Sequence, residues 1–159
     1  MSYGKGTFGQ AASAGVKPWS IQWSAISRMF ATTATGFFRS EDAGFSWIQS
    51  LGGLDRSWGG TFAIVPAAPD RLVLAVSRHA PGTDGAVFRS ANGGVTWARV
   101  MLEGEDEWEV APVITRVWDT EDTLFLAAGD KVWASHDGGK NWLALAAGLP
   151  TAYAIAAAL

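Results

Sequence analysis

SANGGVTW, the stretch at residues 90–97, decides the fold of this chain because the chain contains three versions of it. Residues 40–47 read SEDAGFSW and residues 135–142 read SHDGGKNW. All three share the pattern Ser-x-Asp/Asn-x-Gly-x-(Ser/Thr/Asn)-Trp, and the shared serines lie 50 and 45 residues apart. Self-similarity at such a period is the signature of a repeat architecture. We therefore expect successive copies of one structural unit.

The sequence around each copy predicts four short strands. Two apolar runs precede each copy, and the Trp of the copy begins another short run. A candidate first strand comes before each pair of runs, at residues 21–24, 62–65 and 114–118. Runs of this length, bounded by small and turn residues, favour strands over helices. We expect essentially no helix.

We predict an all-β fold, a β-propeller of four-stranded antiparallel blades, because four strands in about 45 residues is the size of one blade. The expected parts are a flexible N-terminal arm at residues 1–16, blades at about 17–52, 58–102 and 110–148, and one extra strand at 152–159. Propellers normally have about 4–8 blades. We therefore expect copies of this chain, a different protein or the rest of a longer chain to complete the ring.

The residue types of the repeated stretch suit a tight turn between the third and fourth strands. Asp and Asn side chains accept hydrogen bonds from nearby backbone amides, and Gly supplies a positive φ without steric cost. A Trp at the start of the fourth strand can wedge between sheets and bury about 150–250 Å². The structural turn residues are Ser40, Asp42, Gly44, Trp47, Ser90, Asn92, Gly94, Trp97, Ser135, Asp137, Gly139 and Trp142.

This stretch resembles the Asp-box, or BNR repeat, of sialidases, sortilin-like receptors, photosystem II assembly factors and many bacterial β-propellers. Three copies at blade spacing extend the resemblance over most of residues 20–150, with Asn92 for the usual Asp and Asn141 for the usual Ser or Thr. A Ca²⁺ loop is the alternative interpretation, but each copy offers one carboxylate or none, whereas Ca²⁺ takes 6–8 oxygen ligands. We expect turns that serve folding, with no metal and no cofactor.

We predict that the chain is not an enzyme. The resemblance to sialidases implies an arginine cluster and a catalytic Tyr, but the usual Arg-Ile-Pro signature is missing, and Tyr3 and Tyr153 both lie near the ends. The acidic run at 103–109 belongs to one loop, whereas glycoside hydrolysis needs two carboxylates facing each other across the scissile bond. His79 and His136 have no partner at metal-ligand spacing.

Composition excludes some classes of partner. A net charge of −3 without a basic patch argues against nucleic acid. No run reaches the ~18 apolar residues of a membrane span, and the N-terminus lacks the apolar stretch of a signal peptide. The compartment stays undecided: cytoplasm, virion, or an exported protein of which this is a fragment.

Turn parity predicts a second surface. In an up-and-down blade, the loop between strands two and three and the link to the next blade lie opposite the turn between strands three and four. Long loops on one face of a repeat array often bind a partner, although an ordinary solvated set of loops is the alternative. The candidate partner-binding residues are Asp55, Arg56, Trp58, Arg78, His79, Asp84, Glu105, Glu107 and Trp108.

Three functions fit these observations. The first, which we predict, is a non-catalytic structural or interaction module, a building block of a larger assembly such as a phage virion or surface complex. Its partners would be other proteins or copies of itself. The second is a glycan-binding or sialidase-like glycan-processing propeller, with Trp58 and Trp108 exposed to stack on sugar rings. The third is an assembly factor for a membrane complex, for which the expected basic patch is missing.

Overall fold

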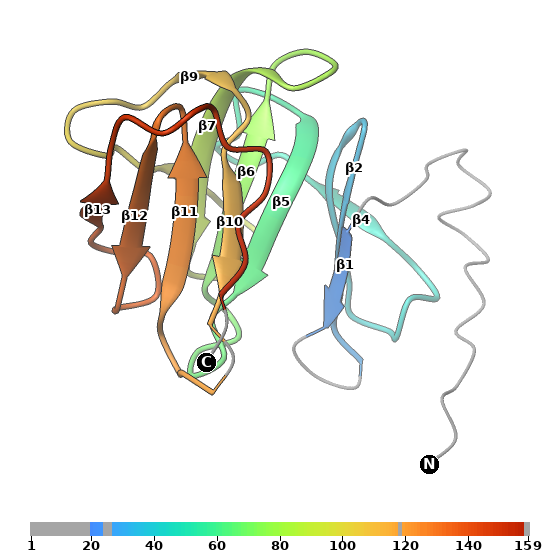
Figure 1. Cartoon of the computed structure of the whole chain (residues 1–159). Coiled ribbons are helices and arrows are strands. Elements are labelled where there is room, and N and C mark those ends of the chain that lie inside the picture. The colour runs from blue at the N-terminus through green and yellow to red at the C-terminus, as the bar shows by residue number, and fades with distance from the viewer. Residues whose placement is uncertain (1–19, 24–26, 118, 158–159) are drawn as a thin grey trace.

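The computed structural model describes residues 20–23, 27–117 and 119–157, and its regular elements are all β-strands (Figure 1). The prediction of an all-β fold is therefore confirmed. In the part of the chain that the structure describes, no helix is long and apolar enough to cross a membrane. The arm that we expected at residues 1–16 lies outside the described residues.

Three antiparallel sheets follow one another along the chain, and we refer to them as the first, second and third blade. The first contains β1 (Ser20–Trp23), β2 (Met29–Thr33), β3 (Gly36–Ser40) and β4 (Ile48–Ser50). The second contains β5 (Trp58–Ile64), β6 (Leu72–Ser77), β7 (Thr83–Ser90) and β8 (Ala98–Arg99). The third contains β10 (Val113–Arg116), β11 (Leu124–Ala128), β12 (Lys131–Ser135) and β13 (Leu143–Ala146).

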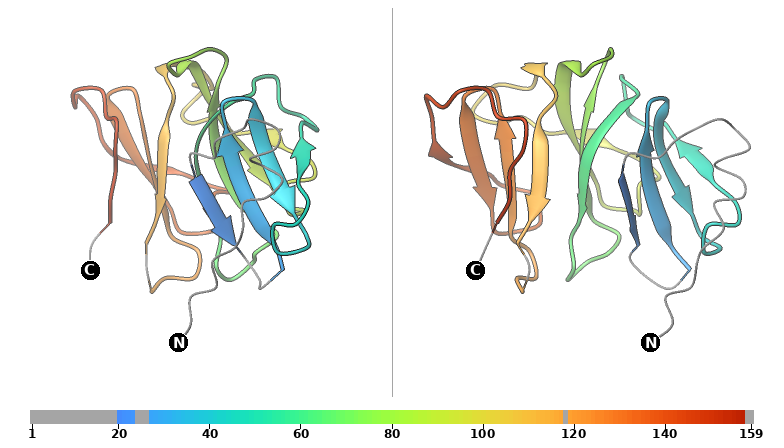
Figure 2. Two further views of the ribbon diagram at one scale, coloured as in Figure 1. Left: turned by 90° about the vertical axis from the view of Figure 1, so that its right-hand side faces the viewer. Right: turned by 45° about the vertical axis from the view of Figure 1, so that its right-hand side comes forward.

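The blades fan out side by side. Their first strands, β1, β5 and β10, lie nearest to one another, and their fourth strands, β4, β8 and β13, lie at the outside (Figure 2). Each strand pairs with the next one in sequence, so every blade is an up-and-down meander. This arrangement is that of a partial β-propeller.

The second blade is the centre of the structure because both of its faces are buried. All six residues of β6 are buried, and successive side chains of a strand point to opposite faces. Leu72 and Leu74 face the first blade, together with Phe30 and Phe37. Val73 and Ala75 face the third blade, in a second cluster that includes Trp133. A run of apolar residues without polar alternation is what burial on two faces requires.

The glycine of the repeated turn sets how closely one blade approaches the preceding one. A Cβ atom at Gly94 would lie 2.8 Å from Cε1 of Phe37 in the first blade. A Cβ at Gly139 would likewise overlap a methyl group of Val73 in the second blade. Both glycines have positive φ, of +75° and +80°. Only glycine meets the conformational and the steric requirement together.

Backbone hydrogen bonds place the repeated turns on one side of the blades. The amide of residue 43 donates to the carbonyl of residue 27 at 2.7 Å, that of 93 to 70 at 2.8 Å, and that of 138 to 122 at 2.9 Å. In each blade the acceptor lies between the first and second strands. The turns between strands one and two and between strands three and four therefore share a side, as parity predicted.

A short additional strand, β9 (Trp108–Val110), pairs with the start of β7 in the register Thr83↔Val110 and Gly85↔Trp108. The sequence did not suggest it. β8 pairs only with Phe88 and Arg89 of β7, and β9 pairs with the start of the same strand.

The extra strand that we predicted at residues 152–159 is not formed in the described residues. Residues 151–157 make no strand, and the last two residues lie outside the described part. This segment crosses in front of β10 in Figure 1. A strand exists only through its neighbour's hydrogen bonds, and no strand pairs with this segment in the described structure. The prediction of a strand here was therefore wrong.

We expect Gly94→Ala to lower the free energy of unfolding by about 2–4 kcal/mol, because it adds both a strained φ and an overlap with Phe37. Gly148→Ala is the matched control, since Gly148 has the same φ of +75° but no atom within 4 Å of the added Cβ. It should lose only about 1 kcal/mol. Urea denaturation measures both, and equal losses would contradict the blade-contact role of Gly94.

Candidate functional site

The repeated turn is closed by its serine hydroxyl. The Oγ of Ser40, Ser90 or Ser135 accepts a hydrogen bond from the amide of the glycine four residues later, at 2.8, 2.9 and 2.8 Å. Each hydroxyl also donates to the Oδ1 of the Asp or Asn two residues on, at 2.8, 3.0 and 2.9 Å. The same geometry thus occurs in all three blades.

The Asp or Asn side chain spans the rest of the turn. Its Oδ1 accepts the amide of Ser46, Thr96 or Asn141 at 2.8–2.9 Å. Asp42 then accepts a second hydrogen bond from the Ser46 hydroxyl at 2.6 Å, whereas Asn92 donates through Nδ2 to the Thr96 hydroxyl at 2.8 Å. A hydroxyl can donate or accept, so Asn replaces Asp without loss of a contact.

The carboxylates of the first and third turns are occupied by the turns themselves. Both oxygens of Asp42 and of Asp137 accept hydrogen bonds from within their own turn. Among the described residues, no group of three or more His, Cys, Asp and Glu is placed to hold a metal ion. The two carboxylates accept hydrogen bonds from the backbone amides of their own turns.

The three tryptophans pack between blades or against their own turn. The Nε1 of Trp47 and of Trp142 donates to the carbonyl of the turn glycine at 3.1 and 3.2 Å. Trp97 is buried against Phe37, with ring centroids 4.9 Å apart in an edge-to-face geometry. Its Nε1 donates to the Ser50 hydroxyl of the first blade at 3.2 Å, which adds a polar contact across the blade boundary.

Hydrogen bonding lowers the pKa of both turn aspartates. The pKa of Asp42 falls from 3.8 to about 2, mainly through the Ser46 hydroxyl and then the Ser46 amide. Burial raises the pKa of Asp137, but the Asn141 amide and side chain and the Ser135 hydroxyl outweigh it and lower the value to about 2. Each carboxylate therefore stabilises the fold above pH 3.8, and this contribution is lost as pH falls toward 2.

The double variant Asp42→Asn/Asp137→Asn should fold, because Asn92 fills the same position in the second blade. Its stability should depend less on pH than that of the wild type between about pH 4 and pH 2, since two titrating groups are removed. Thermal melts at a series of pH values measure the difference. Parallel pH profiles would show that these carboxylates do not stabilise the turns.

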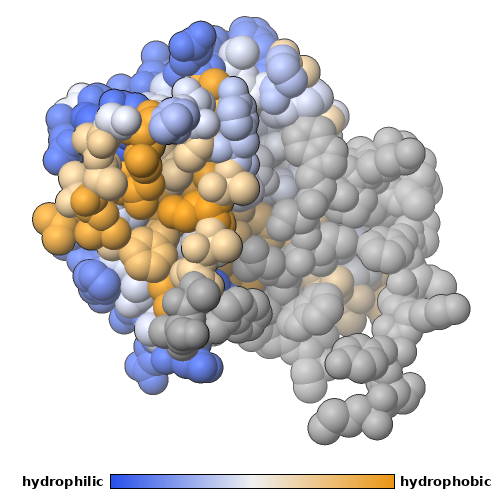
Figure 3. Space-filling view, in the orientation of Figure 1, coloured by the Kyte–Doolittle hydropathy of each residue, from blue (hydrophilic) through white to orange (hydrophobic). Residues whose placement is uncertain are grey.

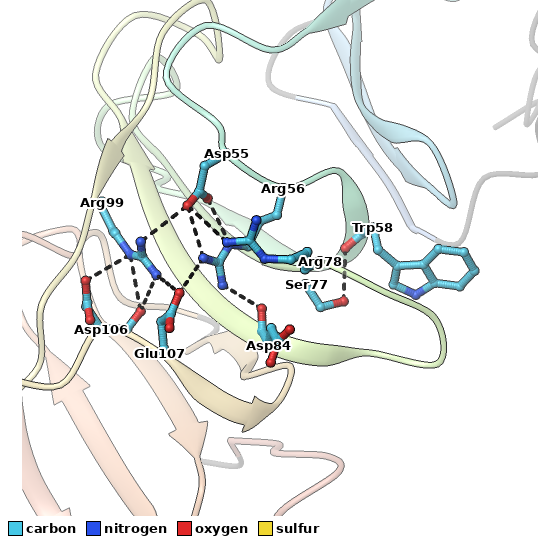
Figure 4. A network of polar contacts seen from close by, with 9 residues as sticks. All are labelled: Asp55, Arg56, Trp58, Ser77, Arg78, Asp84, Arg99, Asp106 and Glu107. Atoms are coloured by element: carbon cyan, nitrogen blue, oxygen red, sulfur yellow. Dashed lines mark hydrogen bonds and ion pairs between the residues drawn. The ribbon is translucent and has the colours of Figure 1, made fainter.

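The opposite face carries a network centred on Arg56 (Figure 4). The Arg56 side chain is 0% exposed, and its nitrogens lie 2.8 Å from Asp55 Oδ1 and 2.8 Å from Glu107 Oε1. It also donates to the backbone carbonyl of Asp84. The link after the first blade is thereby fixed to the hairpin of the second blade and to the link that follows it. A buried guanidinium with three partners is well satisfied.

Arg99 extends this network at the end of the second blade. It lies 3.4 Å from Asp55, 3.2 Å from the carboxylate of Asp106 and 3.0 Å from Glu107. The hydrogen bond from Arg56 lowers the pKa of Asp55 and of Glu107, and Arg99 lowers the pKa of Glu107 further. Both carboxyl groups are therefore ionised at neutral pH and are held as ion-pair partners.

The remaining candidate residues have mixed surroundings. Trp58 is half-buried and pairs with Ser77 at the end of β6. Arg78 and His79 follow Ser77 and are exposed. Glu105 forms an ion pair with Lys131 of the third blade at 2.9 Å. Trp108 is only 6% exposed and packs edge-to-face on Trp133 with centroids 6.3 Å apart. Our expectation of an exposed Trp108 was wrong, because this ring fills the core between the second and third blades.

The structure thus brings Asp55, Arg56, Asp84 and Glu107 together and leaves Trp108 outside the surface. Sequence reasoning missed three members of the charged clusters, namely Arg99, Asp106 and Lys131. A signal was present for Arg99, which is the one charged residue of the short apolar run at residues 97–101. Lys131 stands at a hairpin tip and carries no local signal.

We expect Arg56→Met to lower the free energy of unfolding by about 1–3 kcal/mol, because it leaves the Asp84 carbonyl without its donor and removes one of the arginine partners of Asp55 and Glu107. Arg78→Met is the control, since Arg78 is exposed and its ion pair with Asp55 is long, at 3.8 Å. This variant should lose less than about 1 kcal/mol. Urea denaturation at low and high salt measures both. A loss for Arg56→Met no larger than the control would mean that the network adds nothing to stability.

The sequence matches no family model, and no curated protein matches it. Several solved structures resemble the fold. An ancestral GH74 enzyme matches 83% of this chain with a TM-score of 0.66 and 18% identity. YCF48 bound to D1 peptide matches 85% with a TM-score of 0.61 and 15% identity. The GH74 xyloglucanase from Xanthomonas campestris matches 79% with a TM-score of 0.53 and 22% identity.

This chain spans 19%, 41% and 22% of those three chains, in the same order. At such identities the likeness concerns the fold alone. It supports the assignment of the three blades as part of a β-propeller.

Proposed function

We propose that the chain is a non-catalytic interaction module, a β-propeller building block of a larger assembly, whose repeated turns are Asp-boxes in a structural role. The observation that carries this proposal is the apolar outer face of the third blade, on the side away from the second blade. Figure 3 shows apolar residues gathered over the front of this blade, which residues 151–157 also cross. Protein partners are the expected ligands of such a face.

The positions on this face are those that the other blades bury. Phe125 and Val132 correspond in register to Val73 and Val87 of the second blade, which are fully buried against the third blade. The same two positions hold buried phenylalanines in the first blade. Phe125 and Val132 are only partly buried. The third blade therefore presents a contact surface of the kind used twice within the molecule.

The charged face favours a non-catalytic role. A glycosidase needs one carboxyl group that stays protonated near the working pH, and this requires a raised pKa. Asp55 and Glu107 have lowered pKa values because Arg56 and Arg99 pair with them. Carboxylates held in this way act as structural ion-pair partners and are poor proton donors.

A second candidate function is glycan binding or glycan processing. It is favoured by the fold likeness to GH74 enzymes, one of them a xyloglucanase, and by the half-buried Trp58 on the charged face. A protein-binding role is favoured in turn by the likeness to YCF48 bound to D1 peptide. A place in a virion or a surface complex is one form that the assembly role would take.

Incubation with xyloglucan and with sialyllactose tests the non-catalytic proposal directly. We expect no release of reducing sugar or free sialic acid above the protein-free control. Asp55→Asn and Glu107→Gln are the matched variants, and they should change stability without changing this baseline. Release by the wild type that either variant abolishes would overturn the proposal in favour of glycan processing.

A further inference from the structure

We propose that the outer face of the third blade binds the first blade of a second copy of this chain, head to tail, so that two copies close one ring. The proposal rests on the proposed interaction function and names its partner. The two blade-to-blade interfaces inside the molecule define what each side of such a contact contains.

In each internal interface, one blade contributes the face that points toward the next blade, which we call the receiving face. The next blade contributes the face that points back toward it, which we call the donor face. The residues on both faces recur at fixed register positions. The receiving face supplies the positions of Phe30 and Phe37 in the first blade, and of Val73 and Val87 in the second. The corresponding residues of the third blade, Phe125 and Val132, have the same apolar character. In the described structure no strand covers them, and residues 151–157 cross this side without pairing.

The donor face is equally regular. It supplies Leu72 and Phe88 in the second blade and Leu124 and Trp133 in the third, all of them 0–2% exposed. These residues pair with, or lie two positions before, the serine of the turn. The first blade places Met29 and Phe38 at the same positions, and both are only partly buried. Ala31 and Thr33 of the same face are buried, so the incomplete cover is confined to the end of this face that carries Met29 and Phe38.

The turn glycine gives an independent indication. The space beside Gly94 and beside Gly139 is filled by a side chain of the preceding blade, Phe37 and Val73 respectively. Beside Gly44, the nearest atoms belong to Met29 and Trp47 of its own blade. Phe125 holds the register position of Val73, and Val132 holds that of Phe37, so these are the residues of a second copy expected to approach Gly44 and the Met29 side chain beside it.

Head-to-tail contacts either close into a ring or continue as a filament. Two copies contribute six blades, which lies within the range of about 4–8 that closed propellers use, whereas three copies exceed it. The geometry therefore favours a closed dimer with two identical contacts. Gly148 and Leu149 donate to Asp130 just before residues 151–157, and the proposal requires these later residues to move aside when the second copy binds.

Mass measurement in solution tests the proposal. Over a dilution series, light scattering should find wild type at twice the 16.8 kDa mass of one chain. Phe125→Glu on the receiving face and Phe38→Glu on the donor face should each raise the dimer dissociation constant about a hundredfold, because each buries an unpaired carboxylate. Phe45→Glu is the matched control, since Phe45 is 74% exposed and should leave the dimer intact.

Mixing the two single variants distinguishes this contact from a symmetric one. One contact in a mixed dimer joins an unaltered receiving face to an unaltered donor face, so the mixture should recover dimer that neither variant forms alone. A contact of like faces would recover none. Circular dichroism spectra identify a variant that merely unfolds. Val132→Glu repeats the test at the second position of the receiving face.

Several results would overturn the inference: a wild type that stays monomeric, a dimer that survives both substitutions, or a mixture without recovery. A monomeric wild type that also fails to hydrolyse glycans would leave the interaction role standing with a different partner. Glycan hydrolysis by a dimer would leave the head-to-tail contact standing and overturn the non-catalytic role.

Discussion

The structure depends on one packing constraint: the second blade is buried on both sides. Its second strand, β6, carries apolar residues at every position but the last, and alternate side chains of the blade form two separate clusters, one with each neighbouring blade. Burial of this kind, at about 25 cal/mol per Å² of apolar surface, is the main source of stability in a chain without disulfides. Each outer blade is held by one of these clusters, so each outer blade depends on the second blade for its apolar packing.

The repeated turn makes that packing possible. Its serine and Asp or Asn satisfy the backbone groups of a sharp reversal, and its glycine leaves room for a side chain of the preceding blade. Local hydrogen bonding and long-range contact are thus combined in eight residues. The opposite side of the blades relies on charge, with Arg56 joining the two links that run between blades.

The sequence was sufficient for the features that repeat. The all-β class, the number of sheets and the side on which the turns lie all follow from three copies of one pattern and from strand parity. Features that occur once could not be obtained in this way. Nothing local indicates that Trp108 points into the core, that Arg56 is buried, or that residues 151–157 have no strand beside them. These depend on which loops meet after the blades have packed.

The exchange of Asp for Asn in the middle turn has a consequence for charge. Three turns on one rim, each with an acidic residue at the same place, would add mutual repulsion with every repeat. Asn92 keeps the hydrogen-bond pattern by reversing the direction of one bond, so the central turn is neutral while its neighbours at Asp42 and Asp137 are ionised. Blade number in such a fold can therefore grow without a matching growth in negative charge along the rim.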